Sequence, residues 1–300
     1  MNNKMKLNEV QKVTSIKEML NLAVKEAGDK IAFEYKDEND KNKNIKVTYK
    51  EFVKDTEELG TAITEIGMQD KHIAIIGENS YKWLTVYLTV LKSTGVFVPI
   101  DRELNLKGII NVLKHSDSEV LFYSKKYEET VEKIKYSEKN KLKHLISMDT
   151  DIHKEGIYSE KELIEKGKEF VEAGDRRFID AKINPEEMSI MLFTSGTTSK
   201  SKVVALSHHN MVSNVMDFAS ILDVDASDRI LSFLPLHHVF ECTVGMLYSL
   251  YIGAERSFCE GIRHIVQNLN EYNITFASFV PAIYESMHKT ILKNLEKEGK

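Results

Sequence analysis

The segment Met191-Leu-Phe-Thr-Ser-Gly-Thr-Thr-Ser-Lys-Ser-Lys-Val-Val-Ala-Leu206 decides most of what this sequence predicts. It continues an apolar run from Met188 to Phe193, which we interpret as a buried strand, and then changes to hydroxyl residues, a glycine and lysines. Small hydroxyl residues let a backbone wrap closely around an anion and add O–H donors to its N–H groups. A strand followed by such a loop is what polyphosphate binding requires. The alternative is a polar surface turn rich in Ser and Thr.

The spacing within this loop separates it from one known phosphate loop and links it to another. The P-loop of nucleoside triphosphatases reads G-x-x-x-x-G-K-[ST], and no second glycine precedes Lys202 here. Instead, the segment resembles the signature of the adenylate-forming superfamily, which includes acyl-CoA synthetases, luciferases and the adenylation domains of peptide synthetases. That signature reads [YF]-T-S-G-[ST]-T-G-x-P-K-G-V, and the run from Phe193 to Thr198 together with Lys202 matches it in order and spacing.

Other segments resemble the same superfamily in the same order along the chain, from about Ser15 to the end. They are Gly77-Glu-Asn-Ser80, Leu91 to Asp101, Leu113 to Phe122, Leu206-Ser-His-His-Asn210, Phe233-Leu-Pro-Leu-His-His-Val-Phe-Glu241 and Phe279-Val-Pro-Ala-Ile-Tyr284. The pair Phe240-Glu241 favours the branch of long-chain fatty acyl-CoA synthetases. The resemblance is weakest between Asp149 and Asp180.

Three positions of the loop depart from the superfamily pattern. Ser199, Ser201 and Val203 stand where the pattern has Gly, Pro and Gly. Glycine permits positive φ and a close approach of phosphates, whereas Val is β-branched and stiff. We therefore expect the substitutions to affect turnover more than the identity of the site.

The resemblance implies an ATP-dependent ligase that activates a fatty acid carboxylate as an acyl-adenylate and then forms a coenzyme A thioester. ATP, Mg²⁺ and coenzyme A would be the cofactor and co-substrates. Aryl-acid or amino-acid adenylation is the alternative within the same class, and a carrier protein could replace coenzyme A as the acceptor. A non-catalytic module that binds nucleotide or a protein partner is the alternative from another class.

The resemblance also assigns roles within the loop. Because an anion attacks a polyanion in adenylation, preorganised donors and cations are needed. The residues that would cradle the phosphates are Thr194, Ser195, Gly196, Thr197 and Thr198. Lys202 would pair with the phosphates or anchor the loop, and the Thr194 hydroxyl would be a Mg²⁺ ligand.

A second candidate site segment follows another predicted strand. His238 would orient the acyl carboxylate or gate its pocket, and the neighbouring His237 competes for this role. The alternatives are a core histidine or a metal pair, and adjacent residues of an extended segment rarely point the same way. Phe240 and three apolar residues that follow it would line an acyl tunnel or would equally be ordinary core: Val244, Met246 and Leu247.

Motifs that the superfamily carries later in the chain do not occur in this sequence. They are a Tyr-Gly-x-Thr-Glu segment, a Thr-Gly-Asp segment and a small C-terminal domain with a lysine that assists adenylation. We therefore expect the chain to be the front part of a longer enzyme, with little activity of its own.

Composition excludes several other classes of protein. The formal net charge is −5, with 42% hydrophobic and 29% charged residues, which is typical of a globular protein that does not bind nucleic acid. The sequence has no run of about 18 apolar residues, so it predicts no membrane span. Contact with a lipid surface stays open. Cys242 and Cys259 have no zinc or disulfide spacing and favour a reducing, cytoplasmic compartment. The oligomeric state is not predicted.

Regular alternation of strand and helix patterns predicts an α/β fold, with two packed subdomains of largely parallel sheets flanked by helices. We place the first subdomain at residues 1–170 and the second, with the phosphate loop, at 171–300, because the stretch from Glu155 to Asp180 is charged and contains glycine. Ligands of such sheets bind beyond the carboxyl ends of the strands. Both the hydroxyl loop and Pro235 to His238 follow strands at that edge.

Overall fold

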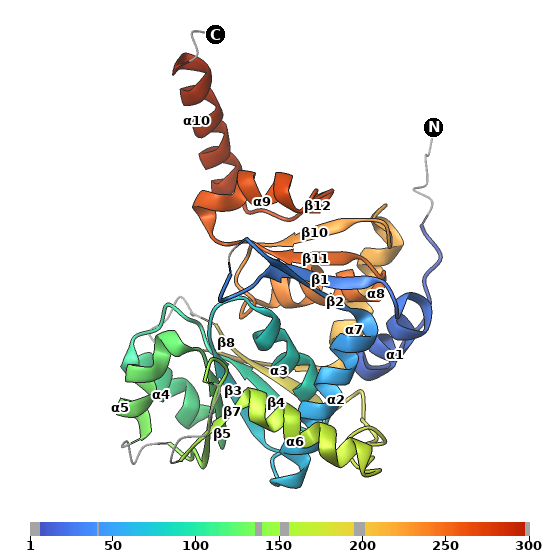
Figure 1. Cartoon of the computed structure of the whole chain (residues 1–300), viewed down its shortest axis with the longest axis vertical. Coiled ribbons are helices and arrows are strands. Elements are labelled where there is room, and N and C mark those ends of the chain that lie inside the picture. The colour runs from blue at the N-terminus through green and yellow to red at the C-terminus, as the bar shows by residue number, and fades with distance from the viewer. Residues whose placement is uncertain (1–6, 41, 136–139, 151–155, 195–201, 298–300) are drawn as a thin grey trace.

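The computed structural model describes residues 7–40, 42–135, 140–150, 156–194 and 202–297. Two sheets, both mostly parallel, lie one above the other in Figure 1 and confirm the predicted α/β class. The upper sheet has the order β12 (Phe276–Ala277), β10 (Arg229–Ser232), β11 (Glu255–Phe258), β1 (Ile31–Lys36), β2 (Asn44–Thr48). The lower sheet has the order β7 (Ile157–Ser159), β6 (His144–Ser147), β5 (Val120–Tyr123), β3 (His72–Ile76), β4 (Val96–Pro99), β8 (Met188–Thr194), β9 (Lys202–Ser207).

The central strands of the lower sheet are buried on both faces, as β3 illustrates. Ile73 and Ile75 point into the core between the two sheets, whereas Ala74 and Ile76 belong to a second core on the outer face. Successive side chains of a strand alternate between faces, so a run that is apolar at every position requires cover on both sides. This explains why the strands of this sheet read as continuous apolar segments.

Helices supply that cover. Between the sheets lie α1 (Ile16–Ala27), α2 (Tyr49–Glu65), α3 (Tyr81–Leu91), α7 (His208–Ile221) and α8 (Tyr248–Tyr251), all of which contribute to the core between the sheets. The outer face of the lower sheet is covered by α4 (Leu106–His115) and α5 (Glu128–Lys135), with the short helix η1 (Lys125–Tyr127) before α5.

Each sheet takes strands from both halves of the chain. The early strands β1 and β2 join β10, β11 and β12, and β1 pairs in parallel with β11 through Phe33 and Arg256. The late strands β8 and β9 join β3 to β7. The sheets therefore do not divide the chain near residue 170, and the assignment of subdomains to 1–170 and 171–300 stays a prediction.

Local sequence signals fix several elements. The amphipathic pattern of residues 16–27 predicts a helix, and α1 has these bounds. The sequence Thr48-Tyr-Lys-Glu51 predicts a capping box, and Thr48 and Glu51 form one at the start of α2. The segment from Val239 to Ile252 predicts a single α-helix, but its first part is the π-helix η2 (Glu241–Leu247), which then continues as α8. π-Helices are rare and frequent at functional sites.

The charged stretch that we interpret as a boundary holds a strand and a helix, β7 and α6 (Glu160–Glu172). Ser159 caps α6 by accepting a hydrogen bond from the backbone of Glu162. A Cβ on Gly167 would clash with the backbone carbonyl of Glu58 in α2. The two helices therefore pack backbone against backbone, which the glycine permits.

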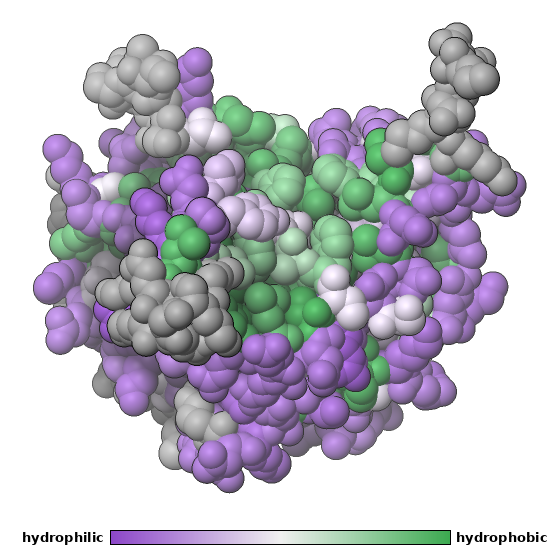
Figure 2. All heavy atoms as spheres, turned by 90° about the horizontal axis from the view of Figure 1, so that it is seen from above, coloured by the Kyte–Doolittle hydropathy of each residue, from purple (hydrophilic) through white to green (hydrophobic). Residues whose placement is uncertain are grey.

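The last described helices lie above the upper sheet in Figure 1 and are η3 (Ile262–His264), α9 (Ile265–Glu271) and α10 (Pro281–Lys297). Of these, α10 extends away from the rest of the molecule. Seen from this side, apolar surface gathers in the middle and hydrophilic surface surrounds it (Figure 2). Ile262, Val266, Val280 and Tyr284 of this segment are exposed. Within the described ranges, no helix has the length and apolarity needed to cross a bilayer.

Candidate functional site

The loop of hydroxyl residues begins and ends on one hairpin. β8 and β9 pair antiparallel, with Thr194 opposite Lys202 at the open end. β8 itself runs parallel to β4, through Phe97 and Ile190, so the hairpin opens at the edge where the parallel strands of the lower sheet end. Both Thr194 and Lys202 are exposed there, and Thr194 Oγ1 lies 3.5 Å from the carbonyl oxygen of Lys202.

The middle of the loop lies outside the described residues, and with it the predicted phosphate ligands Ser195, Gly196, Thr197 and Thr198. Their roles stay predictions. The described ends of the loop nevertheless establish its setting: Lys202 brings a positive charge to the rim of the sheet. Among the described side chains, no acidic group forms an ion pair with it.

A second loop follows β10, at the same kind of edge of the upper sheet. Asn79, which follows β3 of the lower sheet, fastens this loop with both ends of its amide: Nδ2 donates to the carbonyl oxygen of Leu234 at 2.7 Å, and Oδ1 accepts from the N–H of Leu236 at 3.1 Å. The N–H of His238 donates to the carbonyl oxygen of Pro235 at 3.0 Å. The loop is thus a defined turn that Asn79 ties to the lower sheet. We call the space between the two sheets at this edge the crevice.

His237 is buried within this turn. Its Nε2 lies 3.2 Å from Oδ1 of Asp101, which follows β4 of the lower sheet, and only 8% of its side chain is exposed. Burial, together with the neighbouring His238, lowers the pKa of His237 to about 4, and Asp101 opposes this change. His237 is therefore neutral at pH 7, and its contact with Asp101 is a second link between the sheets.

His238 occupies the opposite position. Its side chain is exposed, and its ring centroid lies 4.3 Å from that of His237. The two rings lie close together in the turn, but it is the ring of His237 that contacts Asp101. The imidazole free to meet a ligand at the crevice is accordingly that of His238, and its catalytic role stays a prediction.

The structure brings these two segments to one edge. β4 lies directly beside β8 in the lower sheet, so Asp101, at the end of β4, neighbours the strand that ends at Thr194. Asp101 in turn contacts His237 of the upper sheet. The hairpin and the histidine turn therefore face the same crevice, with positive charge on one side and imidazole on the other. Such an arrangement suits the binding of anions.

A sequence profile of the family described as AMP-binding enzyme matches residues 20–300. The chain belongs to this AMP-binding enzyme family. Among curated proteins, a chloroplastic long-chain-fatty-acid–acyl-carrier-protein ligase of Arabidopsis thaliana is 23% identical over 84% of this chain and 36% of its own length. A long-chain-fatty-acid–CoA ligase of Rattus norvegicus is 28% identical over 82% of this chain and 38% of its own length.

Solved structures share the fold of this chain. A long-chain-fatty-acid–CoA ligase of Archaeoglobus fulgidus superposes with a TM-score of 0.82, at 19% identity, over 98% of this chain and 57% of that one. The N-terminal domain of a Mycobacterium tuberculosis protein gives a TM-score of 0.77 at 19% identity, over 92% of this chain and 65% of that one. The chain spans about 36–41% of the length of the curated relatives that it matches.

The sequence alone assigned no role to the residues that link the two sheets at the histidine turn. Asn79 and Asp101 both lie in segments that resemble the superfamily, directly after predicted strands, and this position was the available signal. A third residue, Glu241, is buried in η2: its Oε1 accepts from Arg256 Nη2 at 2.6 Å and from Ser232 Oγ at 2.9 Å. A buried ion pair therefore links the π-helix η2 to β11.

The residues proposed for an acyl tunnel divide into two groups. Phe240 is 48% exposed beside His238, whereas Val244, Met246 and Leu247 are buried. Met246 and Leu247 belong to the core between the sheets. Of the four, Phe240 is placed to meet a ligand in the crevice, and the burial of the other three is what ordinary core residues show.

The fit of Mg²⁺ is limited on this chain. Mg²⁺ prefers several oxygen ligands and is often held by one or two carboxylates together with phosphates and water. Near the hairpin, the described residues offer the Thr194 hydroxyl, and within the described ranges no three His, Cys, Asp or Glu side chains come together as a metal site. These residues alone do not form a Mg²⁺ site, so Thr194 as a ligand stays a prediction.

Proposed function

We propose that this chain supplies the phosphate-binding and acyl-binding part of an ATP-dependent acyl-CoA ligase. The reaction joins a fatty acid carboxylate to the α-phosphate of ATP, expels pyrophosphate and then transfers the acyl group to coenzyme A. The observation that carries the proposal is the meeting of the hydroxyl hairpin and the histidine turn at one crevice of an AMP-binding enzyme. The two cysteines without disulfide spacing favour the cytoplasm as its location.

In this proposal the hairpin handles the polyphosphate. Lys202 is exposed at the rim and supplies the positive charge, while Thr194 to Thr198 supply hydroxyl and N–H donors. Charge builds on the departing pyrophosphate during adenylation, so donors that are fixed in advance lower the barrier. The Thr194 hydroxyl would also contact Mg²⁺ that arrives with the nucleotide.

The histidine turn handles the acid. His238 is the exposed member of the pair, and we assign it the role of orienting the carboxylate beside Phe240. His237 is neutral and tied to Asp101, so it positions the turn and does not contact the substrate. A fixed turn lowers the entropic cost of bringing carboxylate and phosphate together.

A fatty acid is our choice of substrate because the similar curated proteins are ligases of long-chain fatty acids. Aryl acids and amino acids are the runner-up, since an anthranilate CoA ligase shares the fold with a TM-score of 0.78. The experiment is carboxylate-dependent exchange of pyrophosphate into ATP by the full-length natural protein, with fatty, aryl and amino acids compared. If none of the tested carboxylates supported the exchange of pyrophosphate into ATP, the proposal would be contradicted.

A non-catalytic nucleotide-binding module is the second candidate, and Ser199 and Val203 are the observation that favours it. Both stand where the superfamily pattern has glycine. The test replaces both with Gly in the full-length protein. A large gain in exchange would identify a slow enzyme, whereas nucleotide binding without exchange in either form would identify the module.

A further inference from the structure

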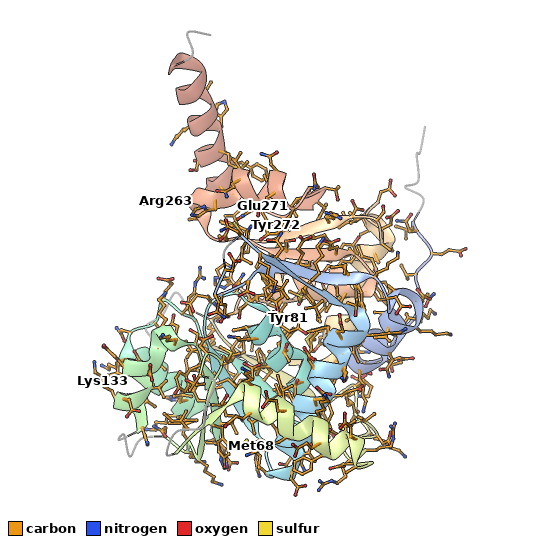
Figure 3. All side chains as sticks on the ribbon, in the orientation of Figure 1. Met68, Tyr81, Lys133, Arg263, Glu271 and Tyr272 are labelled. Carbon is orange, nitrogen blue, oxygen red and sulfur yellow. The ribbon has the colours of Figure 1, made fainter. Side chains whose placement is uncertain are left out.

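A well-formed cavity among the described residues lies beside the crevice of the hairpin and the histidine turn. It has a volume of about 850 Å³, within the range of roughly 300–1,000 Å³ typical of small-molecule sites. It lies where β1, β6, β7 and β11 end, between the two sheets, and Tyr81 marks its position in the middle of Figure 3. Strand ends of this kind are where α/β proteins bind ligands.

One wall of this cavity carries a buried acid without a partner. Glu160 is the first residue of α6, and only 2% of it is exposed. Among the described residues, neither of its carboxylate oxygens has a hydrogen-bond partner. A buried carboxyl group that makes no hydrogen bond costs free energy, and more so when it is ionised. A natural ligand that donates to it would remove that cost.

Two lysines of the cavity wall are already paired. Lys82 Nζ lies 2.9 Å from Glu38 Oε1 and 3.0 Å from Asp149 Oδ1, so it bridges the two sheets. Lys36 forms an ion pair with Glu271. Glu165 and Glu260 of the wall are exposed to solvent, so Glu160 is the fully buried acid of the wall that lacks a partner among the described residues.

The rest of the wall is apolar and aromatic. The rings of Tyr35 and Tyr81 stack with their centroids 5.3 Å apart, and Met148, Ile164 and Phe258 also line the cavity. Aromatic faces attract cations and pack well against an apolar body. An occupant of this space needs an apolar part for these faces and a donor for Glu160.

We propose that this cavity is a second ligand site, which binds a small organic ammonium ion with an apolar body through Glu160. An ammonium group offers N–H donors to the carboxylate oxygens. It also brings the positive charge that an ionised Glu160 needs as a partner. A metal ion fits less well, because the described residues form no group of three metal-ligating side chains. The site adjoins the hairpin crevice, which lies at the ends of β4, β8 and β10, and Asn79 borders both.

The helix N-termini at the cavity favour an anionic ligand, whereas Glu160 favours a cationic one. The charge of the ligand therefore tests the proposal. Both α3, capped by Ser80, and α6, capped by Ser159, begin here, and a helix N-terminus attracts anions. At α6 this position is already taken by Glu160 itself. We therefore expect cations to bind and matched anions to bind more weakly.

Binding should also release a proton. Burial raises the pKa of Glu160 well above its usual range, which keeps the acid protonated, and Lys82 from α3 opposes this. Three further acids that face Glu160 add to the increase: Asp149 after β6, Asp55 of α2 and Glu38 after β1. When the ammonium ion pairs with Glu160, the carboxyl group loses its proton to the solvent, so that charge is balanced.

The test compares three probes of one shape on the 300-residue chain by isothermal titration calorimetry: 2-phenylethylamine, 2-phenylethanol and 3-phenylpropanoate. The amine should bind at least about tenfold more tightly than the alcohol, since a hydrogen bond to a charged group is worth about that factor. Titrations in two buffers of different ionisation enthalpy should reveal the release of about one proton. An alcohol or carboxylate that binds as tightly as the amine overturns the proposal, as does the absence of amine binding.

Glu160→Gln keeps the shape of the side chain and should weaken the amine about tenfold and abolish proton release. Glu165→Gln is the matched control, because Glu165 lines the same cavity but is exposed, and it should change the affinity less than about twofold. Circular dichroism verifies that both variants fold. Equal amine affinity in Glu160→Gln and the wild type contradicts the assignment of the anchor. The comparison of the three probes on the wild-type chain decides the proposal even if the variant does not fold.

Discussion

The two segments that face the crevice are held in opposite ways. At the hairpin, Thr194 and Lys202 are exposed register partners, and the hydroxyl of Thr194 makes a long contact of 3.5 Å with the carbonyl oxygen of Lys202. At the histidine turn, Asn79 makes two hydrogen bonds to the backbone, His237 contacts Asp101, and the following π-helix stands on a buried ion pair. The turn is built into the core, whereas the hairpin end is free to respond to a ligand. Substitutions in the turn should therefore cost stability, and substitutions in the hairpin should cost activity.

The strongest test of the built-in turn removes Glu241. Glu241 and Arg256 are almost fully buried, and loss of one partner leaves the other charge buried and unpaired. Glu241→Leu should lower the free energy of unfolding by about 3–5 kcal/mol, as measured by urea denaturation. The double variant with Arg256→Met should recover much of this loss. A single variant as stable as the wild type would break the contrast between the two segments.

The hairpin is tested by Lys202→Ala. Removing this charge should lower pyrophosphate exchange by the full-length protein about 100-fold, as loss of one stabilising group does in other active sites. The melting temperature should stay the same, since Lys202 is exposed. Lys166→Ala removes an exposed lysine of α6 and should change neither quantity. A large drop in melting temperature for Lys202→Ala would show that the hairpin end is structural.

Asn79→Ala probes the tie between the sheets. It removes both hydrogen bonds to the turn, at Leu234 and Leu236, and should destabilise the protein by about 1–3 kcal/mol. Chemical denaturation measures this loss. Asn39→Ala alters an exposed residue that lines the same cavity as Asn79, so it is the matched control and should have little effect. Equal stability of the two variants would mean that the turn holds its shape without Asn79.

The last and most gradual effect concerns pH. The pKa of His237 is lowered from 6.5 to about 4, so between these values the unfolded chain binds a proton that the folded chain does not. Stability should therefore fall as the pH falls from about 6.5 to 4, with His237 contributing a slope of up to about 1.4 kcal/mol per pH unit. His237→Gln should reduce the slope in pH-dependent denaturation, whereas His264→Gln removes an exposed imidazole and should not. An unchanged slope in His237→Gln would contradict a buried, neutral His237.

Local signals were sufficient for much of the fold. Apolar runs predicted the buried strands of the lower sheet, and the capping box at Thr48 predicted the start of α2. Other elements depend on distant partners. β9 is exposed along most of its length and forms only because it pairs with β8, and α6 depends on the close approach of Gly167 to Glu58. An exposed strand such as β9 carries no burial pattern of its own, whereas α6 does have an amphipathic pattern and a Ser159 cap, which the many charged residues of the stretch obscure.

The candidate site divides in the same manner. The chemistry of the hairpin is written in its residue types, so Thr194 and Lys202 could be singled out from the sequence. The ties of the turn could not, because Asn79 and Asp101 act through contacts more than 130 residues away, at Leu236 and His237. The choice of His238 over His237 rested on resemblance. The geometry supports it, because it shows His237 already engaged and His238 exposed.

The pairing of β1 with β11 has a consequence for how this chain is made. Phe33 and Arg256 are register partners in the upper sheet, so the ribosome must add more than 200 residues after β1 before its parallel neighbour exists. At about 5–20 residues per second, the β1–β2 hairpin waits roughly 10–45 s with one edge unpaired. Lys36, Lys43 and Lys46 on that hairpin place positive charges along it, which discourage pairing with a neighbouring nascent chain.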